Sequence, residues 1–351
     1  MTSYEDASLL LRTSDFDYGL PPELIAQTPV EPRDASRLLV LHRDTGAIEH
    51  RRFHDLETFL RPGDLLVFND SRVIPARLFG RRVDTGSKVE LLLLRRESPG
   101  VWRALGKPGR RLRPGVRFAI DGATGLEGEV VEIVDEGLRL VRFNNERGLE
   151  RAGIVPLPPY IHASLPDPER YQTVYARQPG SVAAPTAGLH FTPETLSRLR
   201  DKGVRQAFVT LHIGLDTFRP VQAESPLEHK LHTEYYELPQ ATADEVNAAR
   251  RETRRVVAVG TTAVRTREQA ALLAGGGELR AASGWADLFI LPGRHRFRAV
   301  DAMVTNVHLP RSTLLMLVSA FAGREHVLAA YREAVAQRYR FYSMGDAMLI
   351  I

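Results

Sequence analysis

The sequence predicts a mixed α/β (α+β) protein in which a large α/β domain carries an inserted small all-β barrel. Short strands follow one another between residues 77 and 151 with almost no helical periodicity, which is typical of a small barrel. From about residue 156 strands alternate with helices, and the residues before 75 follow a similar strand–helix–strand pattern. A chain of 351 residues is also long for one hydrophobic core. We therefore expect the first part of the large domain at 1–75, the barrel at 76–152 and the second part of the large domain at 153–351.

The first part and the barrel are read from apolar segments separated by turn residues. Residues 38–42 and 48–53, joined by a turn containing Gly46, predict a hairpin, 54–60 a short helix and 64–68 a buried strand. The predicted barrel strands are 89–95, 101–105, 116–120, 128–134 and 138–143.

The second part shows the α/β alternation. Its predicted strands are 206–213, 256–260 and 299–305, and its predicted helices are 193–202, 243–254 and 326–338. Thr192 followed by Pro193 predicts the start of the first helix, because threonine caps a helix and proline suits its first position. Thr242 and Glu245 have the spacing of a capping box and predict the start of the second.

Composition restricts the chemistry that the chain can carry. Cysteine is absent, which excludes thiol nucleophiles, thiolate zinc sites, disulfides and cysteine-held iron–sulfur clusters. The N-terminal residues lack the pattern of a secretory signal, and the longest apolar run, 314–322, is too short to span a bilayer. We expect a cytoplasmic protein without a membrane partner.

The basic residues are almost all arginine, since only four of the 47 are lysine. Arginine binds phosphates in two-point contacts, which favours a nucleic-acid partner. The base composition of a genome explains the same preference, so charge alone supports RNA binding only weakly.

Two segments place a histidine beside glycine in a run too apolar for an ordinary surface loop, at 181–191 and 208–220. Gly188 and Gly214 allow the backbone to approach a ligand closely, and His190 and His212 can exchange protons near neutral pH. The alternative is that both histidines are core residues with satisfied hydrogen bonds.

Two predicted strands end in polar residues. The strand at 256–260 runs into Thr261 and Thr262, which predict a threonine cap, and Arg265 follows on the first helical turn. Strand ends that feed helix starts bind anionic groups in α/β folds. Asn306 and His308 stand at the end of the next strand, before a helix that Ser312 or Thr313 can cap. Capped turns without a ligand explain both junctions equally well.

The segment 228–237 holds the densest group of titratable residues. In a strand His232, Glu234 and Tyr236 share one face, whereas a helix would bring His229 and His232 together. The second arrangement is a weak zinc signal, and solvated charge is a common outcome, but imidazole and carboxylate groups also suit acid–base chemistry. A further polar group, Asn69, Asp70, Arg72 and Arg77, follows a buried strand at the expected domain junction, where it predicts either a ligand site or hinge salt bridges.

Eight segments together resemble one enzyme family, the S-adenosylmethionine:tRNA ribosyltransferase-isomerases of queuosine biosynthesis. They are FNDSRVIPARL, SVAAPTAGLHFTPE, FVTLHIGLDTFRP, EHKLHTEYYELP, VVAVGTTAVRT, GWADLFILPG, VTNVHLPRSTLLMLVSAFAG and RFYSMGDAMLI. The resemblance extends from about Phe16 to the C-terminus and is loose only in the barrel segment. The chain departs from the family pattern at Asp216, Ala263, Tyr342 and Met344, and Asp216 adds a carboxylate beside the expected pocket.

The resemblance implies an α/β domain with an inserted barrel and a defined reaction. Members move the ribosyl part of S-adenosylmethionine onto the 7-aminomethyl-7-deazaguanine at the wobble position of tRNA, rearrange it to an epoxide and release adenine and methionine. The implied partners are S-adenosylmethionine, consumed as a co-substrate, and a tRNA with a GUN anticodon. The resemblance implies no other cofactor and no metal, and we expect a monomer.

The resemblance, with the motifs above, assigns roles to residues of this chain. The expected acid–base residues are His190, His212, His232 and Glu234. The expected S-adenosylmethionine contacts are Thr186, Gly188, Phe191, Gly214, Thr261, Thr262, Arg265, Asn306 and His308. The expected tRNA contacts are Asn69, Asp70, Arg72, Arg77, Arg81, Arg82, Arg110, Arg111, Arg113 and Lys230. Which residue is the base and which the acid stays open, as does the effect of Asp216.

Two competing hypotheses come from other classes of protein. One is a metal-dependent hydrolase that uses His190, His212, His229 and His232. The other is a non-catalytic tRNA-binding protein with the barrel as its RNA platform.

Overall fold

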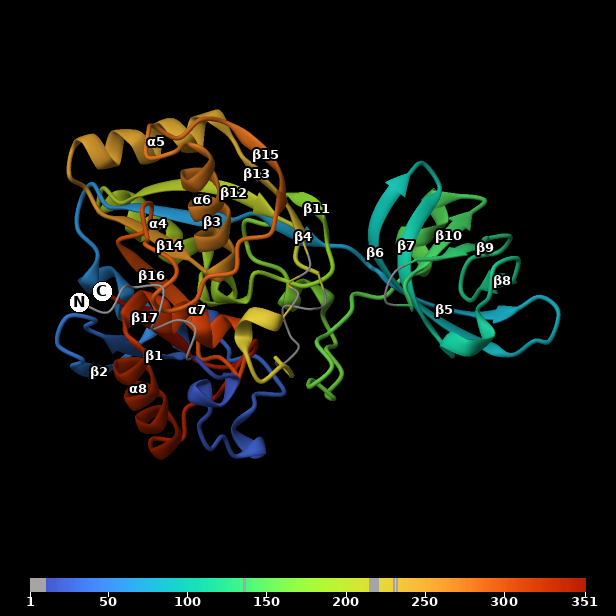
Figure 1. Ribbon diagram of the computed structural model, residues 1–351, viewed down its shortest axis with the longest axis horizontal. Coiled ribbons are helices and arrows are strands. Elements are labelled where there is room, and N and C mark those ends of the chain that lie inside the picture. The colour runs from blue at the N-terminus through green and yellow to red at the C-terminus, as the bar shows by residue number, and fades with distance from the viewer. Residues whose placement is uncertain (1–10, 135–136, 215–220, 230, 232) are drawn as a thin grey trace. The chain divides into compact units, whose positions relative to one another are not determined.

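The computed structural model describes residues 11–134, 137–214, 221–229, 231 and 233–351. Asp216, Lys230 and His232 lie outside the described residues. The described residues form two compact units, one from Met1–Ser71, Pro159–Gln178 and Pro185–Ile351, the other from Arg72–Pro158 and Pro179–Ala184. A large sheet with helices forms the first unit and a closed barrel the second, so the predicted fold class is confirmed (Figure 1).

The first unit is built on one nine-stranded sheet. Its order is β15 (Ala282–Ala286), β13 (Glu234–Leu238), β12 (Arg205–Leu211), β3 (Leu65–Asn69), β14 (Val256–Val259), β16 (Ala302–Asn306), β17 (Ala347–Ile350), β1 (Arg37–Leu41) and β2 (Ile48–Arg52). The four strands β12, β3, β14 and β16 are parallel. Their carboxyl ends therefore share one edge of the sheet, where open α/β sheets bind ligands.

The core follows from the period of two along the strands. Leu66 and Phe68 of β3 lie on the same face as Val257 and Val259 of β14, and all are buried in one apolar cluster. Helix α4 (Pro193–Asp201) covers this face with Leu196 and Leu199. The short 3₁₀ helix η9 (Thr186–His190) precedes α4 and contributes Ala187 to the same cluster.

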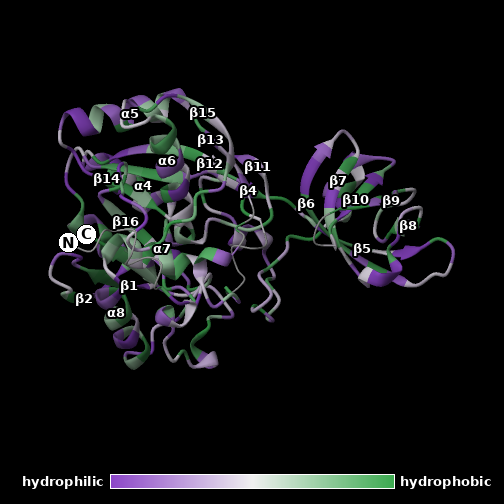
Figure 2. Ribbon diagram, in the orientation of Figure 1, coloured by the Kyte–Doolittle hydropathy of each residue, from purple (hydrophilic) through white to green (hydrophobic). Residues whose placement is uncertain are grey.

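The remaining helices of the first unit are α2 (Leu56–Phe59), α5 (Gln240–Arg251), α6 (Thr261–Leu273), α7 (Thr313–Ala322) and α8 (Arg324–Ala336). Figure 2 shows α7 mostly in the hydrophobic colour, in keeping with its almost complete burial. No single helix among the described residues is both long and apolar enough to cross a bilayer. Only the pair α7 and α8 meets those criteria, taken together across a bend of 118°.

Some predicted helix starts are confirmed and others are wrong. The Thr192 side chain accepts a hydrogen bond from the Thr195 backbone N–H, and Ser312 caps α7 in the same way through Leu315. The capping box at Thr242 is wrong, because α5 begins at Gln240 and the Thr242 hydroxyl donates to the Phe208 carbonyl of β12. The Thr242 side chain therefore makes a tertiary hydrogen bond to another strand and does not cap its own helix.

The second unit is a closed six-stranded barrel. Its order is β10 (Arg139–Phe143), β7 (Val101–Lys107), β6 (Lys88–Ser98), β5 (Arg77–Arg82), β8 (Arg117–Ile120) and β9 (Glu127–Ile133). Helix α3 (Leu149–Ala152) follows β10. Strand β5 was not predicted, because three of its six residues are arginines and Leu78 is its only residue in the apolar barrel core. Two further strands, β4 (Ser71–Val73) and β11 (Gln178–Ser181), pair in a separate two-stranded sheet.

Candidate functional site

The first histidine segment meets the end of β16. His190, at the end of η9, is buried, and its Nε2 lies 3.2 Å from the Asn306 amide nitrogen. Asn306 in turn accepts a hydrogen bond from the Thr186 hydroxyl at 2.9 Å, which orients its amide nitrogen toward the imidazole. Nε2 of His190 is therefore the acceptor, and Nδ1 carries the proton that is donated to Ser36 Oγ at 2.8 Å.

This environment keeps His190 neutral. Burial is the main cause that lowers the pKa of His190 to about 3, and the charges of Arg170, Arg33 and Arg340 lower it further. The ring also stacks on Phe53 with a centroid separation of 5.1 Å. The result is a fixed, neutral imidazole at the carboxyl edge of the sheet, whose Nε2 accepts a hydrogen bond from Asn306 and whose low pKa makes it a weak base in the free enzyme.

A second group joins the chain after β12 and the start of β13 to α6. Glu234 forms a buried ion pair with Arg265, and its other oxygen accepts a hydrogen bond of 2.9 Å from the Gly214 backbone N–H. Arg265 also donates to the Leu288 carbonyl at 3.3 Å. The guanidinium expected to hold an anionic group of the substrate is thus already neutralised by Glu234.

His212 directly follows the end of β12. It lies near a third polar group, which contains Asp70 and Asn69. Its Nδ1 is buried without a hydrogen-bond partner among the described residues, and burial lowers the pKa of His212 while Asp70 raises it. Asp70 accepts a hydrogen bond from the Thr210 hydroxyl at 2.7 Å and pairs with Arg177 at 3.0 Å. Asn69 is fully buried, and its amide bridges to both backbone groups of Leu211, so it holds β3 to β12.

The start of α6 differs from the predicted threonine cap. Gly260, with a φ of +89°, occupies the N-cap position, and no side chain caps the helix there. The Thr262 hydroxyl is instead buried without a partner in the described part of the chain. A Cβ on Gly260 would lie 3.5 Å from that hydroxyl and 3.6 Å from the Ala187 side chain, so the start of α6 faces η9 closely.

Gly188 is required by the same close approach. A Cβ at this position would overlap the hydroxyl of Tyr175, which is itself buried and has no hydrogen-bond partner among the described residues. Two hydroxyls near η9, on Tyr175 and Thr262, therefore have no hydrogen-bond partner among the described residues. Buried polar groups are normally paired, so these two hydroxyls are exceptions.

Two expected substrate contacts have core surroundings. Phe191 is fully buried between Phe53 and Phe68, with ring centroids 4.9 and 5.1 Å away. His308 is buried, its Nε2 lies 2.8 Å from the Thr305 hydroxyl, and burial lowers its pKa to about 3.

The expected tRNA contacts of the barrel divide into paired and unpaired arginines. Arg82 forms a two-point ion pair with Asp84, and Arg77 lies 3.6 Å from Glu90. Four others are exposed and form no ion pair within the described residues, namely Arg81, Arg110, Arg111 and Arg113. Arg82 also donates to the Arg111 carbonyl at 3.3 Å, which places these two residues next to each other on the barrel.

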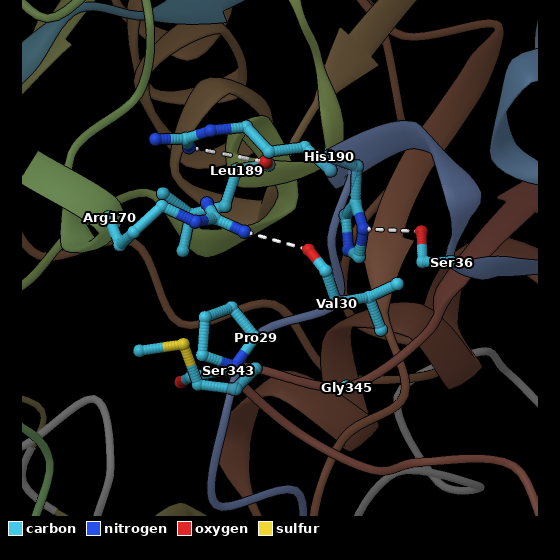
Figure 3. A pocket seen from close by; sticks show the side chains of 10 residues that line it. Pro29, Val30, Ser36, Arg170, Leu189, His190, Ser343 and Gly345 are labelled. Carbon is cyan, nitrogen blue, oxygen red and sulfur yellow. Dashed lines mark hydrogen bonds between the residues drawn. The ribbon is translucent and has the colours of Figure 1, made fainter. Parts of the chain in front are cut away.

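A pocket beside His190 contains residues that the sequence analysis did not identify. The pocket is small, with a cavity volume of about 20 Å³, and it opens to solvent. Figure 3 shows it from close by. It is lined by His190 and by Pro29, Val30, Arg33, Ser36, Arg170, Leu189, Ser343, Met344 and Gly345. Leu189 and His190 belong to the first histidine segment, and residues 343–345 lie in the family-like segment RFYSMGDAMLI. The segment 29–36 and Arg170 carry no such pattern, so no local signal marked them. No group of three or more potential metal ligands occurs among the described residues.

Comparison with known proteins agrees with this arrangement. A family model described as "Queuosine biosynthesis protein" matches residues 13–350. Proteins named S-adenosylmethionine:tRNA ribosyltransferase-isomerase from Symbiobacterium thermophilum and Moorella thermoacetica are 58% and 56% identical to this chain, and each match covers 97% of this chain and 100% of the relative. A crystal structure of S-adenosylmethionine tRNA ribosyltransferase from Thermotoga maritima is 44% identical, with a TM-score of 0.56 over 96% of this chain and 100% of that chain. The chain therefore belongs to the S-adenosylmethionine:tRNA ribosyltransferase-isomerase family of queuosine biosynthesis, and it is an enzyme.

Proposed function

We propose that the enzyme transfers the ribosyl part of S-adenosylmethionine to 7-aminomethyl-7-deazaguanine at the wobble position of a tRNA with a GUN anticodon. The product is epoxyqueuosine in tRNA, with release of adenine and methionine. The observation that carries this proposal is the neutral imidazole of His190, held by Asn306 and Ser36 at the carboxyl edge of the sheet, in a chain more than half identical to relatives named for this activity.

The chemistry suits the groups present. A sulfonium centre makes the neighbouring C5′ hydrogens acidic, so a positioned base can remove one of them, and an acid near the adenine ring nitrogens helps adenine to leave. We assign the base role to His190, which requires that bound substrate replace the Asn306 hydrogen bond at Nε2 and raise the low pKa of the imidazole. We keep His212, His232 and Glu234 as further acid–base candidates. S-adenosylmethionine is consumed as a co-substrate, and the proposed reaction requires neither a metal nor another cofactor.

The remaining contacts follow from exposure and pairing. We propose that the unsatisfied hydroxyls of Tyr175 and Thr262 bind polar atoms of S-adenosylmethionine, together with the backbone of Gly188 and Thr261. We propose that the tRNA backbone lies against the unpaired arginines of the barrel, and that the enzyme acts as a monomer.

One incubation tests the reaction. The purified, metal-stripped enzyme is mixed with S-adenosylmethionine and tRNA carrying the modified base, the nucleosides are analysed by mass spectrometry, and adenine and methionine are quantified. We expect all three products in equal amounts, and none with tRNA that carries unmodified guanine. Absence of product with the modified tRNA would refute the proposed function.

The base assignment has its own test. We expect His190→Ala to lower kcat by about 10²–10⁴-fold, which is the usual contribution of a general base. Its affinities for S-adenosylmethionine and tRNA should stay close to wild type. His54→Ala, at an exposed histidine, serves as the control. Wild-type adenine release by His190→Ala would remove His190 from the mechanism.

A further inference from the structure

The pocket beside His190 carries positive charge that the acid–base chemistry does not use. Arg33 and Arg170 line it together with His190 and Ser36. Figure 3 shows Arg170, His190 and Ser36 around it. All lining residues belong to the first unit, and η9 supplies His190.

Arg33 has no carboxylate partner among the ion pairs of the described residues. It donates to three backbone carbonyls, those of Gln172 at 2.9 Å, Leu189 at 3.3 Å and Glu169 at 3.1 Å. Burial is the main cause that lowers the pKa of Arg33, and the like charge of Arg170 is the next. Nearby carboxylates offset only part of this effect, so Arg33 is a partly buried cation without direct compensation.

Arg170 adds a second guanidinium to the same pocket. Its side chain is 15% exposed and pairs with Glu31, whose side chain is 65% exposed. It also donates to the Val30 carbonyl at 2.8 Å, as Figure 3 shows. Glu31, Asp167 and Glu169 oppose the effect of Arg170 on Arg33, but Arg33 forms an ion pair with none of them within the described residues.

We propose that this pocket binds an anionic oxygen group of a substrate, a carboxylate or a phosphate, between Arg33 and Arg170 and next to His190. Guanidinium groups bind such oxygens in two-point contacts, and an anion would compensate the unpaired charge of Arg33. The inference rests on the proposed function, which offers two sources of this group. These are the carboxylate in the methionine part of S-adenosylmethionine and a phosphate of the tRNA backbone.

Binding of the anion would also act on His190. Arg33 and Arg170 both lower the pKa of this imidazole in the free enzyme. An anion between the two arginines offsets their charge and raises the pKa of His190, which makes it a stronger base. Substrate binding and the basicity of His190 are then coupled through one pocket.

The experiment compares three variants of the full chain. Arg170→Gln removes the positive charge, whereas Arg170→Lys keeps the charge but removes the two-point hydrogen bonding of the guanidinium. Arg200→Gln is the control, because Arg200 is exposed and does not line the pocket. Dissociation constants are measured separately for S-adenosylmethionine, for its decarboxylated analogue and for tRNA. Thermal unfolding of each variant is recorded alongside.

We expect Arg170→Gln to weaken one ligand by about 10–100-fold, the range of a charge-assisted contact of about 1.5–3 kcal/mol. A loss for S-adenosylmethionine but not for its decarboxylated analogue identifies the carboxylate, and a loss for tRNA alone identifies a phosphate. Unchanged affinity for every ligand in folded Arg170→Gln overturns the proposal. Should Arg170→Gln fail to fold, Arg170→Lys decides, since an affinity at least threefold weaker supports the anion site and wild-type affinity overturns it.

The test separates this inference from the proposed reaction. Wild-type enzyme is assayed in parallel for adenine release with modified tRNA. Product formation with unaffected binding in Arg170→Gln refutes only the anion site. Altered binding in Arg170→Gln without product from the wild type refutes only the reaction.

Discussion

At the scale of single residues, burial sets the chemistry of this enzyme more than charge pairing does. His190 and His308 are both neutral because burial lowers the pKa of each to about 3. Glu234 and Arg265, by contrast, remain together as a buried ion pair that joins three chain segments. These two kinds of site respond differently to pH and to substitution.

The buried histidines predict how stability depends on pH. An exposed histidine in the unfolded chain has a pKa of about 6.5. Between about pH 6.5 and 3 the unfolded state therefore binds protons that the native state does not, and the free energy of unfolding falls as the pH decreases. We expect His308→Gln to make this fall less steep by about 1.4 kcal/mol per pH unit, the contribution of one proton. Urea unfolding between pH 4.5 and 7 measures it, with exposed His54→Gln as control, and equal slopes for His308→Gln and wild type would contradict it.

The buried ion pair predicts a large loss of stability. Glu234→Gln leaves Arg265 as an uncompensated buried cation, which costs about 3–5 kcal/mol. The matched control is Glu245→Gln, which breaks the largely exposed pair with Arg205 and should cost at most about 1 kcal/mol. Chemical denaturation at pH 7 gives both values. Similar losses for the two variants would show that burial of the Glu234 pair adds nothing.

At the scale of elements, the short helix η9 connects the first histidine segment to the sheet. It brings Thr186 and His190 to Asn306 at the end of β16, and it lies against the start of α6. Its path depends on a glycine, because the Tyr175 hydroxyl occupies the space in which a side chain at 188 would stand.

This contact predicts a defective variant and its repair. Gly188→Ala should displace η9 and lower kcat strongly, about as much as a misplacement of 1 Å, which costs about 10²-fold. The double variant Gly188→Ala/Tyr175→Phe removes the overlapping hydroxyl and should recover part of the activity. Steady-state kinetics of adenine release compare both with Tyr175→Phe alone. Full activity of Gly188→Ala would show that η9 adapts without cost.

At the scale of the whole molecule, the arginines of the barrel predict how tRNA binding responds to salt. Replacing Arg110, Arg111 and Arg113 by alanine should make the plot of log affinity against log salt concentration less steep, by about one for each lost phosphate contact. The control triple variant, with the same change of charge, replaces Arg96, Arg103 and Arg117, which pair with barrel carboxylates. Equal slopes for the two variants would mean that only total charge matters.

Much of the whole molecule could be predicted from the sequence, because its patterns are local. Five of the six barrel strands, the parallel strands and the caps at Thr192 and Ser312 follow from periodicity and turn residues. The capping box at Thr242 failed because its hydroxyl bonds a distant strand instead. Contacts between side chains that are far apart in the sequence could not be predicted either. The sequence predicted that Arg265 binds an anion, but its partner Glu234 lies 31 residues away. Arg33 and Arg170, the arginines beside His190, come from segments more than 130 residues apart.

The position of β17 has a consequence for biosynthesis. This strand separates β16 from β1, and its four residues are fully buried. The hairpin of β1 and β2 is translated early, yet the neighbour that connects it to the rest of the sheet emerges from the ribosome only after Ala347 has been added. Nascent chains of this enzyme therefore carry an apolar strand edge through most of translation, and such edges are the surfaces that aggregate or recruit chaperones.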